Sequence, residues 1–315
     1  MNFDFTEDQQ TIKSTAREFL AARLKPAKLR ELAEAGEYDD ALWREMCELG
    51  WPGIFIGEEH GGQGLGVVEL VILMEELGYA LAPTPFLSNA AAGLMVQHAG
   101  SPEQREKYLP GVASGEARGT VAYVVDGVAS LVPDAQTADF IVLFDAGSVS
   151  AKIIASDGAS ITELDTIDST RRYARVEAAD GDGEELTGGR GNAGEAVAPL
   201  AVAISGELVG LAQRTMEMAV EYAKERQQFG RPIGAYQAVS HRCAQMLLET
   251  EGARSATLYA AWTADHEPSS LQLAASMAKA YASDCGWRFT GAPLMISWPW
   301  RSSIVSPGRP ITRLM

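Results

Sequence analysis

Cysteine is scarce in this sequence. Its 315 residues include Cys47, Cys243 and Cys285, an odd number of cysteines that lie far apart. A disulfide framework or a thiolate metal site needs paired or closely spaced cysteines, so both are disfavoured. Because the last two fall on apolar helix faces, we expect buried free thiols in a reducing compartment.

Positive charge is also in short supply. The chain has 26 Lys and Arg against 42 Asp and Glu, a formal net charge of −16, and its isoelectric point is near 4.7. Such a composition does not provide the basic face that binds nucleic acid or an anionic membrane. The overall field also repels anionic ligands, so any anion site must be created locally.

Uninterrupted apolar runs are missing as well. The longest apolar stretch, Ala196 to Ala212, is broken by Pro199, Ser205 and Glu207 and predicts a buried helix instead of a membrane span. The first residues lack the charged and apolar regions of a signal peptide. We therefore expect a cytoplasmic protein, and the 46% hydrophobic content predicts a sizeable core in two or three domains.

The most informative stretch is Tyr222 to Gln237, where two helical patterns meet. Gly230, Pro232 and Gly234 lie between them and allow the chain to turn. Apolar residues at three- and four-residue spacing precede the turn (Ile204, Leu208, Leu211, Thr215, Met218, Tyr222) and follow it (Val239, Cys243, Met246, Thr250, Ala253). Two long helices joined by a tight corner are predicted.

Four side chains at this corner form a set that suits a nucleotide: Arg226, Gln228, Phe229 and Gln237. A guanidinium can hold a phosphate through two parallel hydrogen bonds, an aromatic face can cover a planar ring, and amides can bind ring or ribose edges. On spacing alone a plain helical hairpin, with a solvated Arg and a core Phe, explains the same residues.

Residues 1–117 are predicted to form an all-helical domain. Thr6 and Gln9 have the spacing of a capping box, and Ser101 precedes a proline at a first helical position. Helices are expected at about 67–81, 86–99 and 102–113. The glycine-rich stretch 53–64 carries Glu58 and Glu59 without Lys or Arg, which favours a backbone corner over a phosphate site.

From Gly119 short apolar runs predict strands near 120–125, 140–144, 151–155 and 173–176, and thus a small β domain at 118–186. An acidic, glycine-rich linker follows. Its Gly189, Gly191 and Gly194 match a dinucleotide fingerprint, but no apolar strand precedes them and no βαβ unit surrounds them. The linker interpretation is preferred.

Residues 187–290 predict a helical bundle. A third helix should place Leu271, Ala275, Ala278, Tyr281 and Cys285 on its inner face. Residues 291–315 contain four prolines and three arginines and no acid, which predicts an irregular tail. A shifted reading frame or a truncated gene would produce such a tail, and a partner-binding arm is the alternative.

The corner sequence Arg226-Gln-Gln-Phe-Gly-Arg-Pro-Ile-Gly-Ala-Tyr-Gln237 resembles the signature of the acyl-CoA dehydrogenase family, as do Val209-Gly-Leu-Ala-Gln213 before it and Gln245-Met246 after it. The resemblance covers roughly residues 3–290. It implies a mainly α fold with a small β domain, FAD as cofactor, an acyl-CoA substrate, electron-transferring flavoprotein as a partner, and corner residues that hold the flavin nucleotide of a neighbouring subunit.

The sequence departs from the family pattern in three places. After the first strand the flavin-contacting loop of relatives is missing, since Ala122 to Asp126 leads almost directly into Gly127. The second FAD-binding glycine turn and the C-terminal glutamate loop are replaced by residues 291–315. The family's other position for the catalytic base falls at Leu200 or Ala201, neither of which can accept a proton.

No catalytic base is therefore assigned. Glu195 and Glu207 flank that position and are expected to be surface or linker carboxylates. The function hypothesis is an acyl-CoA dehydrogenase, either by itself or as one subunit of a mixed oligomer. The alternative is a degenerate or structural homologue that binds no flavin and has no activity alone. In either case the bundle is expected to assemble into a homodimer or larger oligomer.

Overall fold

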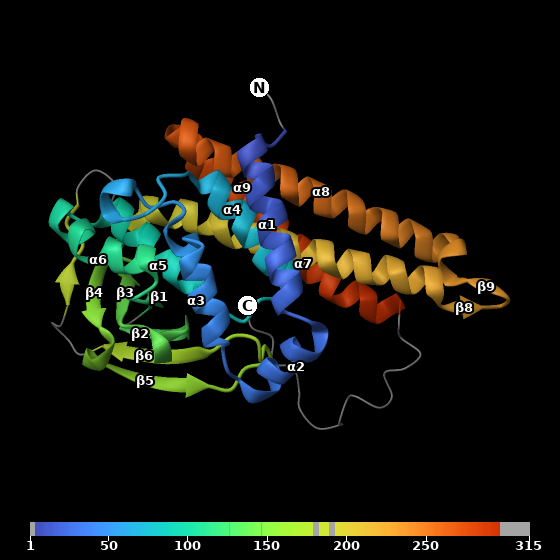
Figure 1. Cartoon of the computed structure of the whole chain (residues 1–315), viewed down its shortest axis with the longest axis horizontal. Coiled ribbons are helices and arrows are strands. Elements are labelled where there is room, and N and C mark those ends of the chain that lie inside the picture. The colour runs from blue at the N-terminus through green and yellow to red at the C-terminus, as the bar shows by residue number, and fades with distance from the viewer. Residues whose placement is uncertain (1–3, 126, 146, 179–182, 189–192, 297–315) are drawn as a thin grey trace.

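In chain order, a small β domain lies between two helical regions. The computed structural model of the chain describes residues 4–125, 127–145, 147–178, 183–188 and 193–296 (Figure 1). The predicted fold class, mainly α with a small β domain, is confirmed. The β domain lies beneath α5 and α6 in the view of Figure 1, and the C-terminal helices extend to the opposite end of the molecule.

The N-terminal region is helical as predicted. Its helices are α1 (Glu7–Arg23), α2 (Pro26–Ala35), α3 (Asp40–Glu48), α4 (Val67–Ala80), α5 (Phe86–Ala99) and α6 (Pro102–Ser114). The capping boxes at Thr6 with Gln9 and at Ser101 with Gln104 are both formed. Helix α2 was not predicted from the sequence.

The β domain consists of two small sheets. One has the order β1-β3-β4-β7 and the other β2-β6-β5, and β1 runs parallel to β3 while the other pairs are antiparallel. The strands are β1 (Gly119–Val124), β2 (Val128–Pro133), β3 (Phe140–Asp145), β4 (Ser150–Ala155), β5 (Ala159–Leu164), β6 (Tyr173–Ala178) and β7 (Glu184–Glu185). Strand β7 lies within the predicted linker, where it pairs with β4.

Apolar side chains between the two sheets form the core of this domain, among them Ala122, Val132, Ile141 and Val176. The other face of β3 carries Phe140, Val142 and Phe144, which join the core of the N-terminal helices. A sheet with both faces buried reads as a continuous apolar run, as in Phe140 to Phe144. The β domain is thus packed on the helical region through one of its sheets.

The C-terminal region is a bundle of α7 (Ala193–Glu225), α8 (Gln237–His266) and α9 (Leu271–Ile296), and the two long helices predicted around the corner are confirmed. The predicted inner face of α7 is displaced by one residue. The buried residues include Val202, Val209, Met216 and Ala219, whereas Met218 is exposed. The true inner face is richer in Ala and Gly, which let α4 come close.

The predicted inner face of α9 is correct except for Tyr281, which is 44% exposed. The helix also runs past the predicted start of the irregular tail, because residues 291–296 are helical. An established helix adds residues without a new nucleation step, so a glycine at 291 does not by itself end it. The rest of the tail lies outside the described residues.

Helix α7 is long and apolar enough to cross a membrane when judged by length and composition alone. The share of its most apolar window that is buried inside the protein is 56%. Helices α4, α5, α8 and α9 pack along it (Figure 1). It is the core helix that the interrupted apolar stretch predicted.

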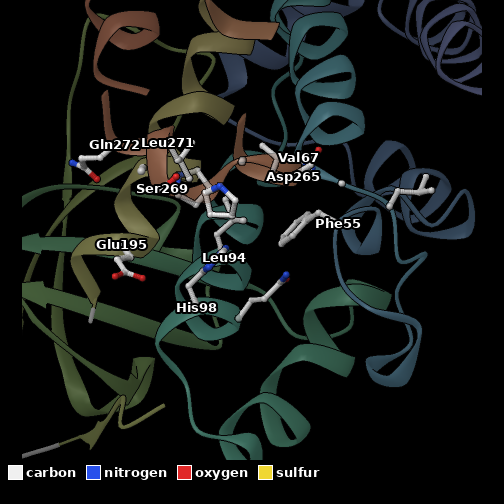
Figure 2. Close-up of a pocket in the computed structure, with 16 residues that line it drawn as sticks. Phe55, Val67, Leu94, His98, Glu195, Asp265, Ser269, Leu271 and Gln272 are labelled. Atoms are coloured by element: carbon white, nitrogen blue, oxygen red, sulfur yellow. The ribbon is translucent and has the colours of Figure 1, made fainter. Parts of the chain in front are cut away.

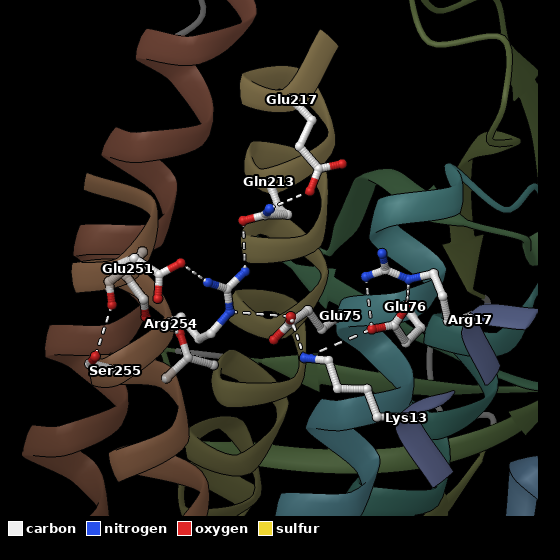
Figure 3. Close-up of polar contacts among 11 residues, drawn as sticks. Lys13, Arg17, Glu75, Glu76, Gln213, Glu217, Glu251, Arg254 and Ser255 are labelled. Carbon is white, nitrogen blue, oxygen red and sulfur yellow. Dashed lines mark hydrogen bonds and ion pairs between the residues drawn. The ribbon is translucent and has the colours of Figure 1, made fainter. Parts of the chain in front are cut away.

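Buried charge on α4 connects the N-terminal helices to the bundle (Figure 3). The side chains of Glu75 and Glu76 are almost fully buried, and ionised carboxylates need partners there. Lys13 on α1 lies 2.8 Å from Glu75, and Arg254 on α8 lies 3.2 Å from the same carboxylate. Arg17 forms a pair of hydrogen bonds with Glu76.

Candidate functional site

The corner between α7 and α8 is a projecting β-hairpin tip, hereafter the tip, residues 226–237. Gln227 pairs with Pro232 and Gln228 with Arg231 in two short strands, β8 (Gln227–Gln228) and β9 (Arg231–Pro232). The turn is made by Phe229 and Gly230, with φ of 53° and 77°. Two successive left-handed residues suit a tight hairpin turn. The tip lies at the far end of the molecule from the β domain (Figure 1).

All four predicted cofactor residues lie on this tip. Phe229 is 93% exposed, and Gln228 and Gln237 are exposed too, while Arg226 is partly buried. The hydroxyl of Tyr236 donates a hydrogen bond to the backbone oxygen of Gln228 over 3.0 Å. The solvated Arg and core Phe of the plain hairpin interpretation are not what is observed, because the ring of Phe229 faces solvent.

The tip carries both cationic and aromatic groups. The guanidinium of Arg231 stands over the ring of Tyr236 with 4.1 Å to the centroid, and Arg226 has no side-chain ion pair among the residues that the structure describes. Groups of these kinds are able to bind a diphosphate and an adenine. An exposed aromatic ring of this size is otherwise costly to leave in water.

The connection between β1 and β2 is short. Val125 and Val128 exchange two backbone hydrogen bonds of 3.0 and 3.1 Å, so the connection from β1 to β2 is a tight turn. Gly127 in this turn has φ 80°. This turn stands where the resemblance leads to the expectation of the flavin-contacting loop of relatives.

The positions expected for a catalytic base carry none. Leu200 packs against the main core, and Ala201 is partly buried on α7. Glu195 is exposed, as predicted. Glu207 is a correction: its side chain is 21% exposed and forms an ion pair with Arg171, from the β5–β6 connection. Burial raises the pKa of Glu207, and the charge of Arg171 opposes that rise.

A second buried carboxylate lies in the same junction between the domains. Asp134 is 2% exposed and accepts hydrogen bonds from the hydroxyls of Tyr38 and Ser88. Burial raises the pKa of Asp134, while these hydrogen bonds and the charge of Arg171 lower it. Asp134 thus connects the β domain to Tyr38 and Ser88 of the N-terminal helical region, and Arg171 connects it to Glu207 on α7. Together these contacts form a structural junction between the domains.

A cavity of about 790 Å³ lies beside the start of α7 (Figure 2). It is enclosed by the glycine-rich corner after Phe55, the end of α5 at Gln97 and His98, the start of α7 at Glu195, and the α8–α9 turn. The volume is typical of a small-molecule site. Burial and the charge of Arg105 lower the pKa of His98, so its ring is neutral at pH 7.

Comparison with known proteins decides the family. The acyl-CoA dehydrogenase N-terminal domain matches residues 6–116, and the acyl-CoA dehydrogenase C-terminal domain matches residues 187–294. This chain belongs to the acyl-CoA dehydrogenase family. The region between the two matches is the β domain, where the sequence resemblance was weakest.

Acyl-CoA dehydrogenase IpdE2 of Mycobacterium tuberculosis is 33% identical over 303 residues, which cover 93% of this chain and 87% of that protein. The ChsE4-ChsE5 complex from the same organism has a TM-score of 0.84 at 25% identity, covering 94% of this chain and 88% of the other. The Tcur3481-Tcur3483 steroid ACAD variant has a TM-score of 0.83 at 25% identity, covering 92% and 87%. Acyl-CoA dehydrogenation is supported as the activity of the family.

Sequence reasoning missed the Asp134–Arg171–Glu207 junction and the cavity. Their residues come from elements that are distant in the chain and share no spacing that a motif could capture. The one available signal was Glu207 itself, a carboxylate inside an apolar helical stretch. From the sequence such a residue can be a surface carboxylate or a catalytic base. In the structure Glu207 forms an ion pair with Arg171.

Proposed function

We propose that the chain is an acyl-CoA dehydrogenase subunit that works in a mixed oligomer. In this arrangement its tip holds the nucleotide half of an FAD, and a homologous partner supplies most of the flavin-ring site and the catalytic carboxylate. One observation carries the proposal: Gln228, Phe229 and Gln237 are exposed at a tip directed away from the chain's own body, with Arg226 partly buried beside them. Such a set needs another chain to complete the site.

The tip residues have separate tasks in this proposal. Arg226 donates charge-assisted hydrogen bonds to the diphosphate, and Phe229 covers the adenine. Gln228 and Gln237 hydrogen-bond to ring or ribose edges. When bound, FAD accepts the hydride that leaves the β carbon of an acyl-CoA thioester. The α proton requires a carboxylate base, which neither Leu200 nor Ala201 provides.

The outer face of the bundle supports an oligomer. Leu273, Met277 and Tyr281 follow one another at four-residue spacing on α9, and they are 69%, 58% and 44% exposed. Leu248 and Tyr259 on α8 are 65% and 45% exposed. An apolar stripe of this length on a soluble chain is typical of a protein interface. The ChsE4-ChsE5 structure is named as a complex, which agrees with a mixed assembly.

An acyl-CoA is the proposed substrate, with electron-transferring flavoprotein as the electron acceptor and a cytoplasmic location. The naming of one structural neighbour as a steroid acyl-CoA dehydrogenase makes bulky acyl groups the first to be tested. The degenerate or structural homologue that binds no flavin is not favoured by the comparisons. It makes a different prediction in the experiment below.

The experiment compares the chain alone with the chain co-expressed with a homologous acyl-CoA dehydrogenase subunit that has its own glutamate. Alone, the chain should purify largely colourless, bind FAD no better than micromolar, and show no turnover with short, long or bulky acyl-CoAs. The missing ring contacts justify this, because each lost hydrogen bond costs roughly 1–3 kcal/mol. The co-expressed pair should be yellow and should reduce an artificial electron acceptor.

Variants at the tip test which residues bind the cofactor. Arg226→Ala or Phe229→Ala in the pair should reduce FAD retention at least about tenfold, which corresponds to roughly 1.4 kcal/mol. Arg175→Ala is the matched control, because Arg175 is exposed on β6, far from the tip. Stoichiometric FAD on the lone chain, or turnover by the lone chain that disappears in Glu195→Gln or Glu207→Gln, would overturn the proposal. A pair that retains no FAD would support the structural homologue.

A further inference from the structure

The tip carries more positive charge than the proposed cofactor residues account for. Its residues 226–237 contain Arg226 and Arg231 and no Asp or Glu, whereas the chain as a whole has a formal net charge of −16. Arg226 is assigned to the diphosphate in the proposed function, and Arg231 has no role there. Two cations without an acid on one short segment create a local positive field on an acidic protein, which favours an anionic ligand.

The guanidinium of Arg231 is available to a ligand. Its side chain is exposed on β9 and forms no ion pair or hydrogen bond with the described part of the chain. It lies instead over the ring of Tyr236, 4.1 Å from the ring centroid. A cation–π contact does not use the N–H donors of a guanidinium, so these donors remain free. Arg231 is therefore held by a contact that leaves its hydrogen-bonding groups unused.

The hairpin register places both arginines on one face of the tip. Gln228 pairs with Arg231 across the two strands. The amide of Ile233 donates a hydrogen bond of 2.8 Å to the backbone oxygen of Arg226, which continues the same register. Because opposed residues share a face, as do residues two positions apart on a strand, Arg226 and Arg231 are diagonal neighbours. Such neighbours are about 7–8 Å apart, so two long side chains can converge on one ligand.

Tyr236 connects the parts of the tip. Its hydroxyl donates the hydrogen bond of 3.0 Å to the backbone oxygen of Gln228 on β8, and its ring contacts Arg231 of β9. The ring of Phe229 in the turn approaches the ring of Tyr236 edge-on, with 6.4 Å between the centroids. Tyr236 itself is partly buried at the N-cap of α8. One anchored ring thus positions the cation of β9 and the aromatic ring of the turn relative to each other.

A purely structural role of these contacts does not explain the cation. Strands β8 and β9 pair through their backbones, and the hydroxyl of Tyr236 bonds to a backbone oxygen, so neither contact depends on the side chain at position 231. A cation–π contact at an exposed site adds little stability. A ligand that contacts both Arg231 and the 93% exposed ring of Phe229 explains why the two groups stand together in water.

A diphosphate that links two nucleosides carries one negative charge on each phosphate, so a single guanidinium leaves one charge unmatched. We propose that Arg231, oriented by Tyr236, is a second diphosphate-binding residue of the tip, beside Arg226. This inference rests on the proposed function, because it adds residues to the same nucleotide site. Arg231 contacts the ligand in this assignment, and Tyr236 is a positioning residue that acts through Arg231 and Phe229.

The experiment uses the co-expressed pair, purified through a tag on this chain and freed of FAD. Binding of FAD is measured by isothermal titration calorimetry at about 0.05 M and about 0.5 M KCl. Arg231→Ala should weaken FAD binding about tenfold or more at the lower salt concentration, and by a smaller factor at the higher one, because salt screens the charge that the variant lacks. A loss that came only from a distorted hairpin would be the same at both.

Lys224→Ala is the matched control for local charge. It removes an exposed cation from the last turn of α7, next to the tip, and should change FAD affinity by less than about twofold. Arg231→Lys keeps the charge without the forked donors and should recover part of the loss. Since the tip projects from the body, each variant should keep the melting temperature of the parent.

Variants of Tyr236 test its positioning role. Tyr236→Phe keeps the ring and should stay within about threefold of the parent, whereas Tyr236→Ala removes the ring and should weaken FAD binding about tenfold. The double variant of Tyr236→Ala with Arg231→Ala should lose less than the product of the two single losses, because one residue acts through the other.

Three results would overturn the inference: FAD affinity unchanged in Arg231→Ala, an equal loss in Lys224→Ala, or fully multiplicative losses in the double variant. A parent pair that binds no FAD contradicts the proposed function and this inference together. A parent pair that binds FAD tightly, with an Arg231→Ala variant that binds it equally well, contradicts this inference alone.

Discussion

Gly210 on α7 lies directly against the backbone carbonyl oxygen of Glu75 on α4, so closely that a β carbon on Gly210 would overlap that oxygen. Gly78 on α4 and Gly206 on α7 make similar approaches, and a β carbon on Gly206 would stand 3.1 Å from the backbone oxygen of Val71. Small residues on facing helices allow the two backbones to touch. This close approach is why the inner face of α7 is richer in Ala and Gly than predicted.

A methyl group at Gly210 should therefore force α4 and α7 apart. Gly210→Ala is expected to lower the free energy of unfolding by about 1–3 kcal/mol, the usual cost of overpacking a core. The measurement is urea unfolding followed by circular dichroism. Gly158→Ala is the control, because nothing lies within 4 Å of a β carbon there, and it should change stability by less than about 0.5 kcal/mol. Equal effects of the two would contradict the steric explanation.

The Arg171–Glu207 ion pair should couple the β domain to α7. Removing one partner leaves the other charge largely buried, so Arg171→Ala or Glu207→Ala alone should cost about 3–5 kcal/mol. The double variant should cost less than the sum of the two single variants. A double-mutant cycle measured by urea unfolding gives this coupling. The exposed pair Arg175 and Glu177 is the matched control, with an expected coupling below about 1 kcal/mol, and an equal coupling in both pairs would sink this interpretation.

His98 should make stability fall on the acid side of neutrality. Its folded pKa lies below the ordinary value of 6.5, chiefly because of burial, so the unfolded chain binds a proton first as the pH drops. Stability is thus fully present above about pH 6.5 and is lost as pH falls towards the folded pKa. His98→Gln should lose less stability than the parent between pH 7.5 and pH 5. His241→Gln, at an exposed position on α8, should behave like the parent.

Self-association should depend on the apolar stripe of α9. We expect a homodimer or larger assembly in light scattering at micromolar concentration, because burial of Leu273, Met277 and their neighbours removes apolar surface from water. Leu273→Glu combined with Met277→Glu should shift the mass towards the 33.7 kDa monomer. Ala22→Glu, on the exposed side of α1, adds charge elsewhere and should not. A parent that is already monomeric would refute this prediction.

How much the sequence predicts depends on how local the determinants are. The tip was located because Arg226, Phe229 and Gln237 lie within a dozen residues, and hairpin geometry then places them together. The small β domain was recognised, but β2 and β5 were missed. Strand β2 lacks regular alternation, and β5 is mostly exposed, so neither gives a clear periodic signal. Local sequence patterns therefore predict the fold class, but they do not identify strands whose apolar residues follow no clear period.

The junction around Asp134 could not be predicted for a different reason. Tyr38, Ser88, Arg171 and Glu207 come from four separate elements, and only the packed structure brings them together. The cavity has the same origin, because its lining comes from the glycine-rich corner and from α4, α5, α7, α8 and α9. The predicted inner face of α7 is also displaced by one residue, because the face that packs against α4 contains several Ala and Gly residues in addition to Val202, Val209 and Met216. Where two helix backbones lie close together, the buried face favours small side chains such as Ala and Gly over large apolar ones.

The paired carboxylates of α4 bear on the order in which this protein can mature during synthesis. Lys13 and Arg17 leave the ribosome before Glu75 and Glu76, but Arg254 follows almost 180 residues later. Until α7 and α8 have been synthesised, the apolar helix α4 packs only against the other N-terminal helices. The carboxylate of Glu75 then lacks the charge of Arg254. We therefore expect a fragment of residues 1–186 to remain loosely packed and to bind a hydrophobic dye such as ANS, whereas the full chain does not. The first third of the polypeptide thus becomes fully native only when the last third arrives.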